Sequence, residues 1–194
     1  MLEHEEQRYG RNKETIVNHS YIESGEYRRK FDEISDNADL NRLLYQIAKK
    51  ILNHRSGTLY EDMYWIDAEA VTVVAKLIDS TQEGGVSYTS SISRVIDKYD
   101  GLITIHSHPH STVPSYNDLF CNYNFGYALG IVVCHDGTIY MYSTEEYIRE
   151  EYYKMAAGNL IRQGIAEDVA FRMILDKLHQ NGRIFFKEVT VDDV

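Results

Sequence analysis

The sequence predicts a layered α+β domain in which helices cover a mixed β-sheet. An apolar pattern of helical period runs through residues 38–53, and the continuous apolar runs at 102–106 and 127–134 are typical of buried strands. Helical and strand-like patterns alternate along the chain without an internal repeat or a low-complexity linker. These observations favour one layered domain, α+β or α/β, over two domains or a repeat array.

Length and composition limit the class of protein. The chain has 194 residues, of which 43% are hydrophobic and 26% charged, and these values suit one globular domain. No stretch approaches the roughly 18 apolar residues of a membrane span. The charged start, MLEHEEQRYG, lacks the apolar core of a signal peptide. We therefore expect a cytoplasmic protein with no membrane partner.

Charge and cysteine content exclude further classes. The formal net charge is −10, and neutralising phosphates requires clustered Lys and Arg, so nucleic acid is not an expected partner. Cys121 and Cys134 lack CxxC spacing, which argues against a disulfide framework and against a thiolate zinc site. Cys134 is expected to be a small buried residue. The oligomeric state is left open by the sequence.

The N-terminal part of the chain divides into an arm and a helix. Residues 1–35 are polar and weakly periodic, so we expect an N-terminal arm that lies on the domain, with one helical turn at 27–31. Residues 36–194 are expected to form a single domain, which opens with an amphipathic helix at 38–53 ended by Gly57.

The middle of the chain alternates short apolar runs with turn signals. The predicted elements are, in chain order, strands at 61–67 and 70–78, a loop at Gly84-Gly85, a short helix capped by Ser90 or Ser91, a strand at 102–106, a helix opening at Ser115, and strands at 127–134 and 138–143. Asp136-Gly137, between the last two strands, is a strong hairpin signal.

The last fifty residues are predicted to form a mostly helical extension, 144–194, interrupted at Gly158 and Gly164. Its clearest helix spans 165–178, and the alternation at 183–191 predicts a final strand.

Residues 105–118, IHSHPHSTVPSYND, carry the main chemical signal. His106 and His108 stand two apart at a strand end, so both imidazoles lie on one face and can reach one metal ion. Ser115 and Asp118 have the S-x-x-D form of a helix start, which can bring the Asp118 carboxylate back towards the histidines.

The side chains of His106, His108 and Asp118 predict a catalytic zinc site. Two nitrogens and one oxygen leave the fourth position of one Zn²⁺ ion free for water, and a further carboxylate must then accept the proton of that water. Each feature also has an explanation without a metal, because HxH pairs occur on strands by chance and S-x-x-D is most often only a helix cap. The combination of strand, HSHP, short loop, Ser and Asp favours the metal site.

The combination resembles the signature of the JAB/MPN (JAMM) metalloproteases: a distant Glu, H-[ST]-H-P, then S-x-x-D. The resemblance covers about residues 38–143 and implies a JAB/MPN-like mixed sheet flanked by helices. It also implies zinc ligation by His106, His108 and Asp118, and oxyanion support by Ser115. Six residues separate His108 from Ser115, where many members have seven. The shorter loop is similar to that of prokaryotic JAB domains.

The family's general base is a Glu just after the first long helix, at the start of a strand. Glu61 meets this description, whereas Asp62 would face the other side of the strand. An exposed acid at a strand start would look the same in sequence. Tyr64 and Asp67 stand where the family usually has glycines, so the shape of the substrate channel is expected to differ.

The resemblance implies hydrolysis of a peptide or isopeptide bond in a peptide tail or a modifier-conjugated protein. Two alternatives stay open: a catalytically silent scaffold or binding module of the same fold, and a zinc hydrolase of a non-protein amide. Barrel amidohydrolases need more than 200 residues and further His ligands. A zinc deaminase needs H-x-E and P-C-x-x-C motifs, which are absent.

Extended peptides are often bound along an exposed sheet edge. The chain order of the family places the loop 110–114 and the segment 81–90 beside the zinc site. We therefore predict that a flexible peptide tail binds in a groove lined by residues 81–90, which become ordered on binding. A surface loop with no role in binding would have a similar composition.

Overall fold

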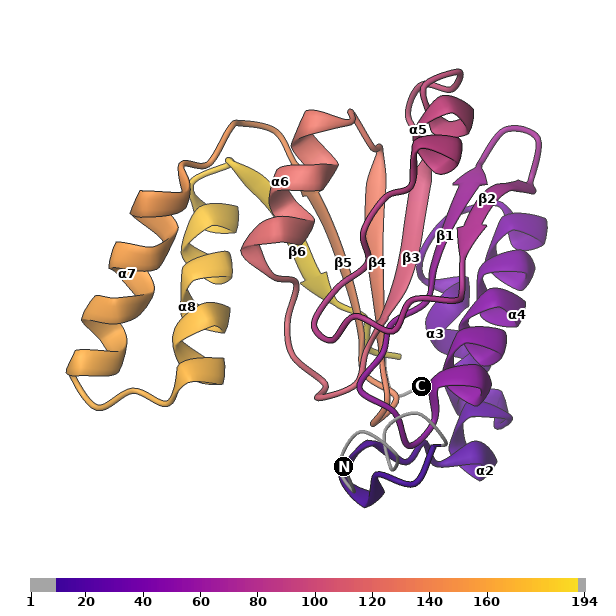
Figure 1. Ribbon diagram of the computed structural model, residues 1–194, viewed down its shortest axis with the longest axis horizontal. Helices are drawn as coiled ribbons and strands as arrows, with labels where there is room; N and C mark the ends of the chain where they lie inside the picture. Colours follow the sequence, from indigo (N-terminus) through magenta and orange to yellow (C-terminus); the bar gives the residue numbers. More distant parts are fainter. Residues whose placement is uncertain (1–9, 192–194) are drawn as a thin grey trace.

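The fold is built on one mixed β-sheet of six strands in the order β2-β1-β3-β4-β5-β6 (Figure 1). The computed structural model describes residues 10–191. The strands are β1 (Met63–Asp67), β2 (Thr72–Leu77), β3 (Ile103–His108), β4 (Leu129–Cys134), β5 (Ile139–Thr144) and β6 (Ile184–Glu188). β3 and β4 are parallel, and the other neighbouring pairs are antiparallel.

Helices cover both faces of the sheet, as the sequence predicts for a layered α+β fold. The helices are η1 (Lys13–Thr15), α2 (His19–Ile22), α3 (Gly25–Asp32), α4 (Ala38–Arg55), α5 (Ser90–Ile96), α6 (Tyr116–Asn124), α7 (Glu150–Arg162) and α8 (Glu167–Gln180). α4 lies along one face with α2 and α3, whereas α6 and the α7–α8 hairpin lie on the other side (Figure 1). No helix within residues 10–191 is long and apolar enough to cross a membrane.

The strands contribute side chains to three hydrophobic cores, because successive side chains point to opposite faces. The smallest core forms around Trp65 of β1 and includes the end of α5. Ile105 and Ile131 pack with α4 in the first core. Val132 and Tyr142 pack with α6 and the α7–α8 hairpin in the second. On β3 the same alternation places Thr104, His106 and His108 together on the face opposite α4. The site therefore lies on the α6 side of the sheet.

The described part of the predicted arm is more ordered than its sequence pattern indicates. It contains η1, α2 and α3 where one helical turn is expected, and Ser24 caps α3 by accepting a hydrogen bond from the Tyr27 amide. Tyr27 and Phe31 are fully buried in the first core against Tyr45. Sparse apolar residues can anchor a segment when they are large aromatics, and periodicity alone does not detect this. Residues 1–9 lie outside the described part of the chain.

Two local predictions are wrong. Thr89, not Ser90 or Ser91, caps α5, since its side chain accepts from the Ile92 amide. Gly158 lies inside α7 and does not interrupt it; the break falls at Gly164, whose φ of 88° is accessible to glycine. The other predicted elements occur within a few residues of their expected bounds.

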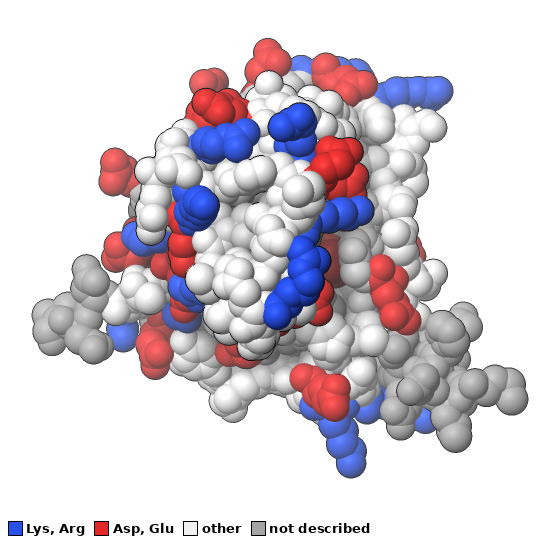
Figure 2. Space-filling view, turned by 90° about the vertical axis from the view of Figure 1, so that its left-hand side faces the viewer, with Lys and Arg blue, Asp and Glu red and all other residues white. Residues whose placement is uncertain are grey.

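Figure 2 shows the end of the molecule formed by the α7–α8 hairpin, where side chains of both charge signs surround an uncharged surface. Met155 and Met173 contribute to this surface and are 66% and 44% exposed. They line an apolar groove between the two helices.

Candidate metal centre

Backbone contacts fix the two segments that carry the predicted site. β3 pairs with β1 so that His106 lies opposite Met63. Just before β1, the Asp62 amide donates to Ser107 Oγ and the Ser107 amide donates to the Asp62 carbonyl, both at 3.3 Å. These bonds hold Glu61 beside the end of β3.

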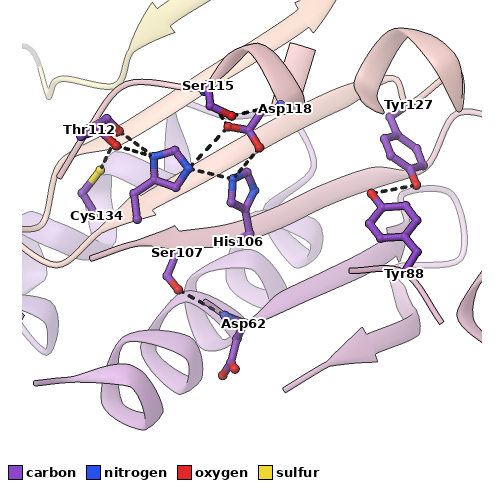
Figure 3. A network of polar contacts seen from close by, with 10 residues as sticks. Asp62, Tyr88, His106, Ser107, Thr112, Ser115, Asp118, Tyr127 and Cys134 are labelled. Carbon is purple, nitrogen blue, oxygen red and sulfur yellow. Dashed lines mark hydrogen bonds and ion pairs between the residues drawn. The ribbon is translucent and has the colours of Figure 1, made fainter. Parts of the chain in front are cut away.

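A capping box at the start of α6 orients Asp118 (Figure 3). Ser115 Oγ accepts from the Asp118 amide at 3.2 Å, and Asp118 Oδ2 accepts from the Ser115 amide at 2.6 Å. The Asp118 side chain is therefore held near the helix start, where it faces the histidines of β3. Asp118 is both a helix cap and part of the cluster, so the two explanations open in the sequence are compatible.

The structure brings His106, His108 and Asp118 together at close range. The Nε2 atoms of the two histidines are 3.1 Å apart. His106 Nε2 lies 3.3 Å from Asp118 Oδ1, and His108 Nε2 lies 3.5 Å from Asp118 Oδ2. A tetrahedral zinc ion with bonds of about 2.0–2.1 Å holds its ligand atoms about 3.3 Å apart. The spacing therefore fits the predicted donor set.

Hydrogen bonding determines which His108 nitrogen faces the cluster. Nδ1 lies 2.8 Å from the Thr112 carbonyl oxygen, which can only accept, so Nδ1 is the donor. Nε2 of the neutral ring then presents a lone pair to His106 and Asp118. Metal-bound histidines commonly have their second nitrogen fixed in this way. His106 Nδ1 is buried without a hydrogen-bond partner among the described residues.

The electrostatics of the cluster favour a positive charge between the two histidines and Asp118. Burial acts to lower the pKa of His108, but the Asp118 and Glu61 carboxylates raise it to about 9. Burial acts to raise the pKa of Asp118, but His106 and His108 hold it well below its usual value. An array of acceptors that retains a proton in this way also suits a divalent cation, which would replace that proton.

Glu61 completes the cluster as a second carboxylate. It is 6% exposed, and ligand-type atoms of Glu61, His106 and His108 all lie within 4.8 Å of one another. Burial raises its pKa, although the two histidines oppose this effect. A buried carboxyl group with a raised pKa can act as a general base, and Glu61 is also close enough to serve as a metal ligand in its own right.

Asp62 points away from the cluster, as its place next to Glu61 predicts. Its carboxylate is buried and contacts Arg55 Nε at 2.5 Å and His54 Nδ1 at 2.7 Å. Arg55 also donates to the Ile78 carbonyl at 2.7 Å. This ion pair ties the end of α4 to the chain beside Glu61, so it supports the site without taking part in it.

The cluster opens into a cleft of about 600 Å³. Residues 82–88 line it, together with Pro109, His110, Thr112 and Ser115. The bridge between Tyr60 and Glu83 joins segment 82–88 to the segment that carries Glu61. Most of the segment predicted to line a groove therefore borders the candidate site.

Four groups that support or line the candidate site were not identified from the sequence: the Thr112 carbonyl, Arg55, Thr104 and Asn122. Two of them follow from periodicity, because Thr104 lies two residues before His106 on a strand and Asn122 lies four after Asp118 on a helix. The carbonyl and the ion pair arise from tertiary contacts that no local pattern records.

Comparison with known proteins identifies no relative: no protein-family model matches the chain, and no curated protein or solved structure matches it.

Proposed function

We propose that this chain is a zinc-dependent metallopeptidase of the JAB/MPN type, which hydrolyses a peptide or isopeptide bond. The observation that carries the proposal is the triangle of His106 Nε2, His108 Nε2 and the Asp118 carboxylate, with edges of 3.1 to 3.5 Å, beside the buried Glu61. In this proposal the first three residues hold one zinc ion and Glu61 stays outside the ligand set.

Bound zinc would lower the pKa of its water to about 7 and polarise a substrate carbonyl. Glu61 would accept the proton of the attacking water and deliver it to the leaving amine, a role to which its raised pKa is suited. Ser115 Oγ accepts from the Asp118 amide, which leaves its hydroxyl hydrogen free to donate to the developing oxyanion at the mouth of the cleft. The walls of the cleft would hold an extended peptide tail or a modifier-conjugated protein.

The test combines metal content with turnover. Protein purified without chelator should contain one zinc per chain, measured by elemental analysis, and should cleave members of a randomised peptide library. Glu61→Gln should retain the zinc and lose about 10²–10⁴-fold in kcat, because it removes the proton acceptor. Glu69→Gln, the same change at an exposed acid after β1, is the matched control and should change neither quantity.

The other outcomes separate the alternatives. Loss of zinc in Glu61→Gln would make Glu61 a ligand and leave the chain without its proposed base. Zinc binding without cleavage of any peptide or isopeptide would favour a binding module or a hydrolase of a non-protein amide. Zinc-free protein that does not take up zinc would refute the proposal.

A further inference from the structure

The cleft continues past the metal-binding residues into a second set of side chains. Thr104 precedes His106 by two residues on β3, and Asn122 follows Asp118 by four on α6, and both line the cleft. The two-residue step along the strand and the four-residue step along the helix each cover about 6–7 Å. α6 connects β3 to the parallel β4, so it runs back along β3 and the two steps lead in the same direction.

Two polar side chains in this part of the cleft are buried, and one of them has an unpartnered group. Asn122 is 1% exposed; its Oδ1 accepts from the Thr144 amide at 2.7 Å, but its Nδ2 has no hydrogen-bond partner among the described residues. The Thr104 hydroxyl is also buried, and it interacts with the Tyr142 hydroxyl. A buried polar group left unpaired destabilises the folded protein, so the free Asn122 Nδ2 in this cleft indicates a ligand that pairs with it.

Tyrosine hydroxyls form the rest of this wall. Tyr142 reaches the cleft across Gly130, which pairs with Thr104; a Cβ on Gly130 would lie 2.1 Å from Tyr142 Cζ. Trp65 Nε1 donates to the Tyr127 hydroxyl. The Tyr127 hydroxyl in turn donates to the Tyr88 hydroxyl at 3.3 Å (Figure 3). The Tyr88 hydroxyl also lies beside the Cys121 thiol, which lines the same cleft.

The charges of the cleft define the chemistry of that ligand. Its described lining contains no Lys or Arg, whereas Glu61, Glu83 and Asp118 contribute to it. Beside Thr104 and Asn122 a carboxylate would have no Lys or Arg partner, and the proposed zinc would lie one step of about 6–7 Å away, so its burial there would carry a desolvation cost. Amides, hydroxyls and carbonyls would find donors in Asn122 and the hydroxyl groups.

We propose that Thr104, Asn122, Tyr142, Tyr127 and Tyr88 form a specificity subsite for a neutral, amide- or hydroxyl-bearing side chain of the substrate. This inference rests on the proposed peptidase function. Extended peptide advances about 3.3–3.6 Å per residue, so the 6–7 Å step places the recognised side chain within two residues of the scissile bond. The subsite discriminates against Asp and Glu at that position.

The experiment uses a randomised octapeptide library with amidated C-termini, with cleavage products and their sites identified by mass spectrometry. Wild type should favour Asn, Gln, Ser and Thr at one position within two residues of the cut and disfavour Asp and Glu. Asn122→Asp keeps the oxygen that pairs with the Thr144 amide but replaces the donor by a negative charge. It should lower kcat/KM for the neutral side chains about tenfold and shift the preference to Lys and Arg.

Asn124→Asp is the matched control, because it makes the same change at an exposed position of α6 and should keep the wild-type preference. Thr104→Val is nearly isosteric and tests the subsite independently if Asn122→Asp fails to fold. An unchanged preference in the folded variants, or a wild-type preference for acidic side chains, would overturn the inference while leaving the peptidase function intact.

A binding measurement separates failure of the subsite from failure of the proposed function. Immobilised Glu61→Gln protein is exposed to the same library, and the retained peptides are sequenced, with and without the added Asn122→Asp change. Selection of neutral polar side chains that is lost with Asn122→Asp would support the subsite even if wild type cleaved nothing. Retention without any such selection would overturn it.

Discussion

Zinc binding should release a proton from His108, and this prediction follows from the geometry of the cluster. In the metal-free protein the Asp118 and Glu61 carboxylates raise the pKa of His108 to about 9, against a usual value of about 6.5. At pH 7 the ring is therefore almost fully protonated. Zinc requires the lone pair on Nε2, because Nδ1 is bound to the Thr112 carbonyl.

The magnitude follows from linkage. Each zinc bound at pH 7 should release about one proton from His108, and below about pH 9 the loss of this proton should by itself lower the dissociation constant about tenfold per pH unit. Between pH 6.5 and 8.5 the affinity should thus rise about 100-fold. Zinc affinity increases with pH because the pKa of His108 is raised in the metal-free state. The proton that competes with zinc is therefore lost as pH rises.

Calorimetric titration of chelator-treated protein with zinc, in buffers of different ionisation enthalpy, measures the number of protons released. Competition with a zinc chelator gives the affinity at each pH. His135 offers an internal comparison, because burial lowers its pKa and it should contribute no proton at pH 7. An affinity independent of pH from 6.5 to 8.5, with no proton release, would refute the proposed coordination by His108.

Three substitutions test the supporting structure. Ser115→Ala should lower kcat on the order of 10²-fold through the lost oxyanion donor. It should also lower the free energy of unfolding by about 1 kcal/mol through the lost helix cap. Enzyme kinetics and urea unfolding measure the two effects, and unchanged kinetics would remove Ser115 from the mechanism. Gly130→Ala should cost about 1–3 kcal/mol because the added Cβ meets the Tyr142 ring, and the same change should cost less in a Tyr142→Ala variant, measured in the same assay; an equal cost in both backgrounds would contradict the proposed clash. Arg55→Met should cost about 3 kcal/mol because it leaves Asp62 buried without its main partner, and adding Asp62→Asn should restore stability; equal stability of Arg55→Met and wild type would contradict this account.

The sequence by itself determined the layered fold class and most of its elements. Helix 38–53, the apolar strands and the Asp-Gly hairpin have strong local patterns, because each buries one face or both faces against a neighbour. It also determined that His106 and His108 share a face, since the period of a strand is two residues. The S-x-x-D pattern likewise placed Asp118 in the first turn of a helix, which the capping box at Ser115 confirms.

Only the tertiary structure decided how these parts meet. The order β1-β3-β4 brings Glu61, some forty-five residues away in sequence, within 4.8 Å of the histidines, and no local pattern encodes that distance. The Thr112 carbonyl, the Arg55–Asp62 pair and the unpartnered Asn122 depend on contacts between separate elements. Local periodicity reports which face of an element is buried, whereas the chemistry of a site depends on what lies opposite that face after packing.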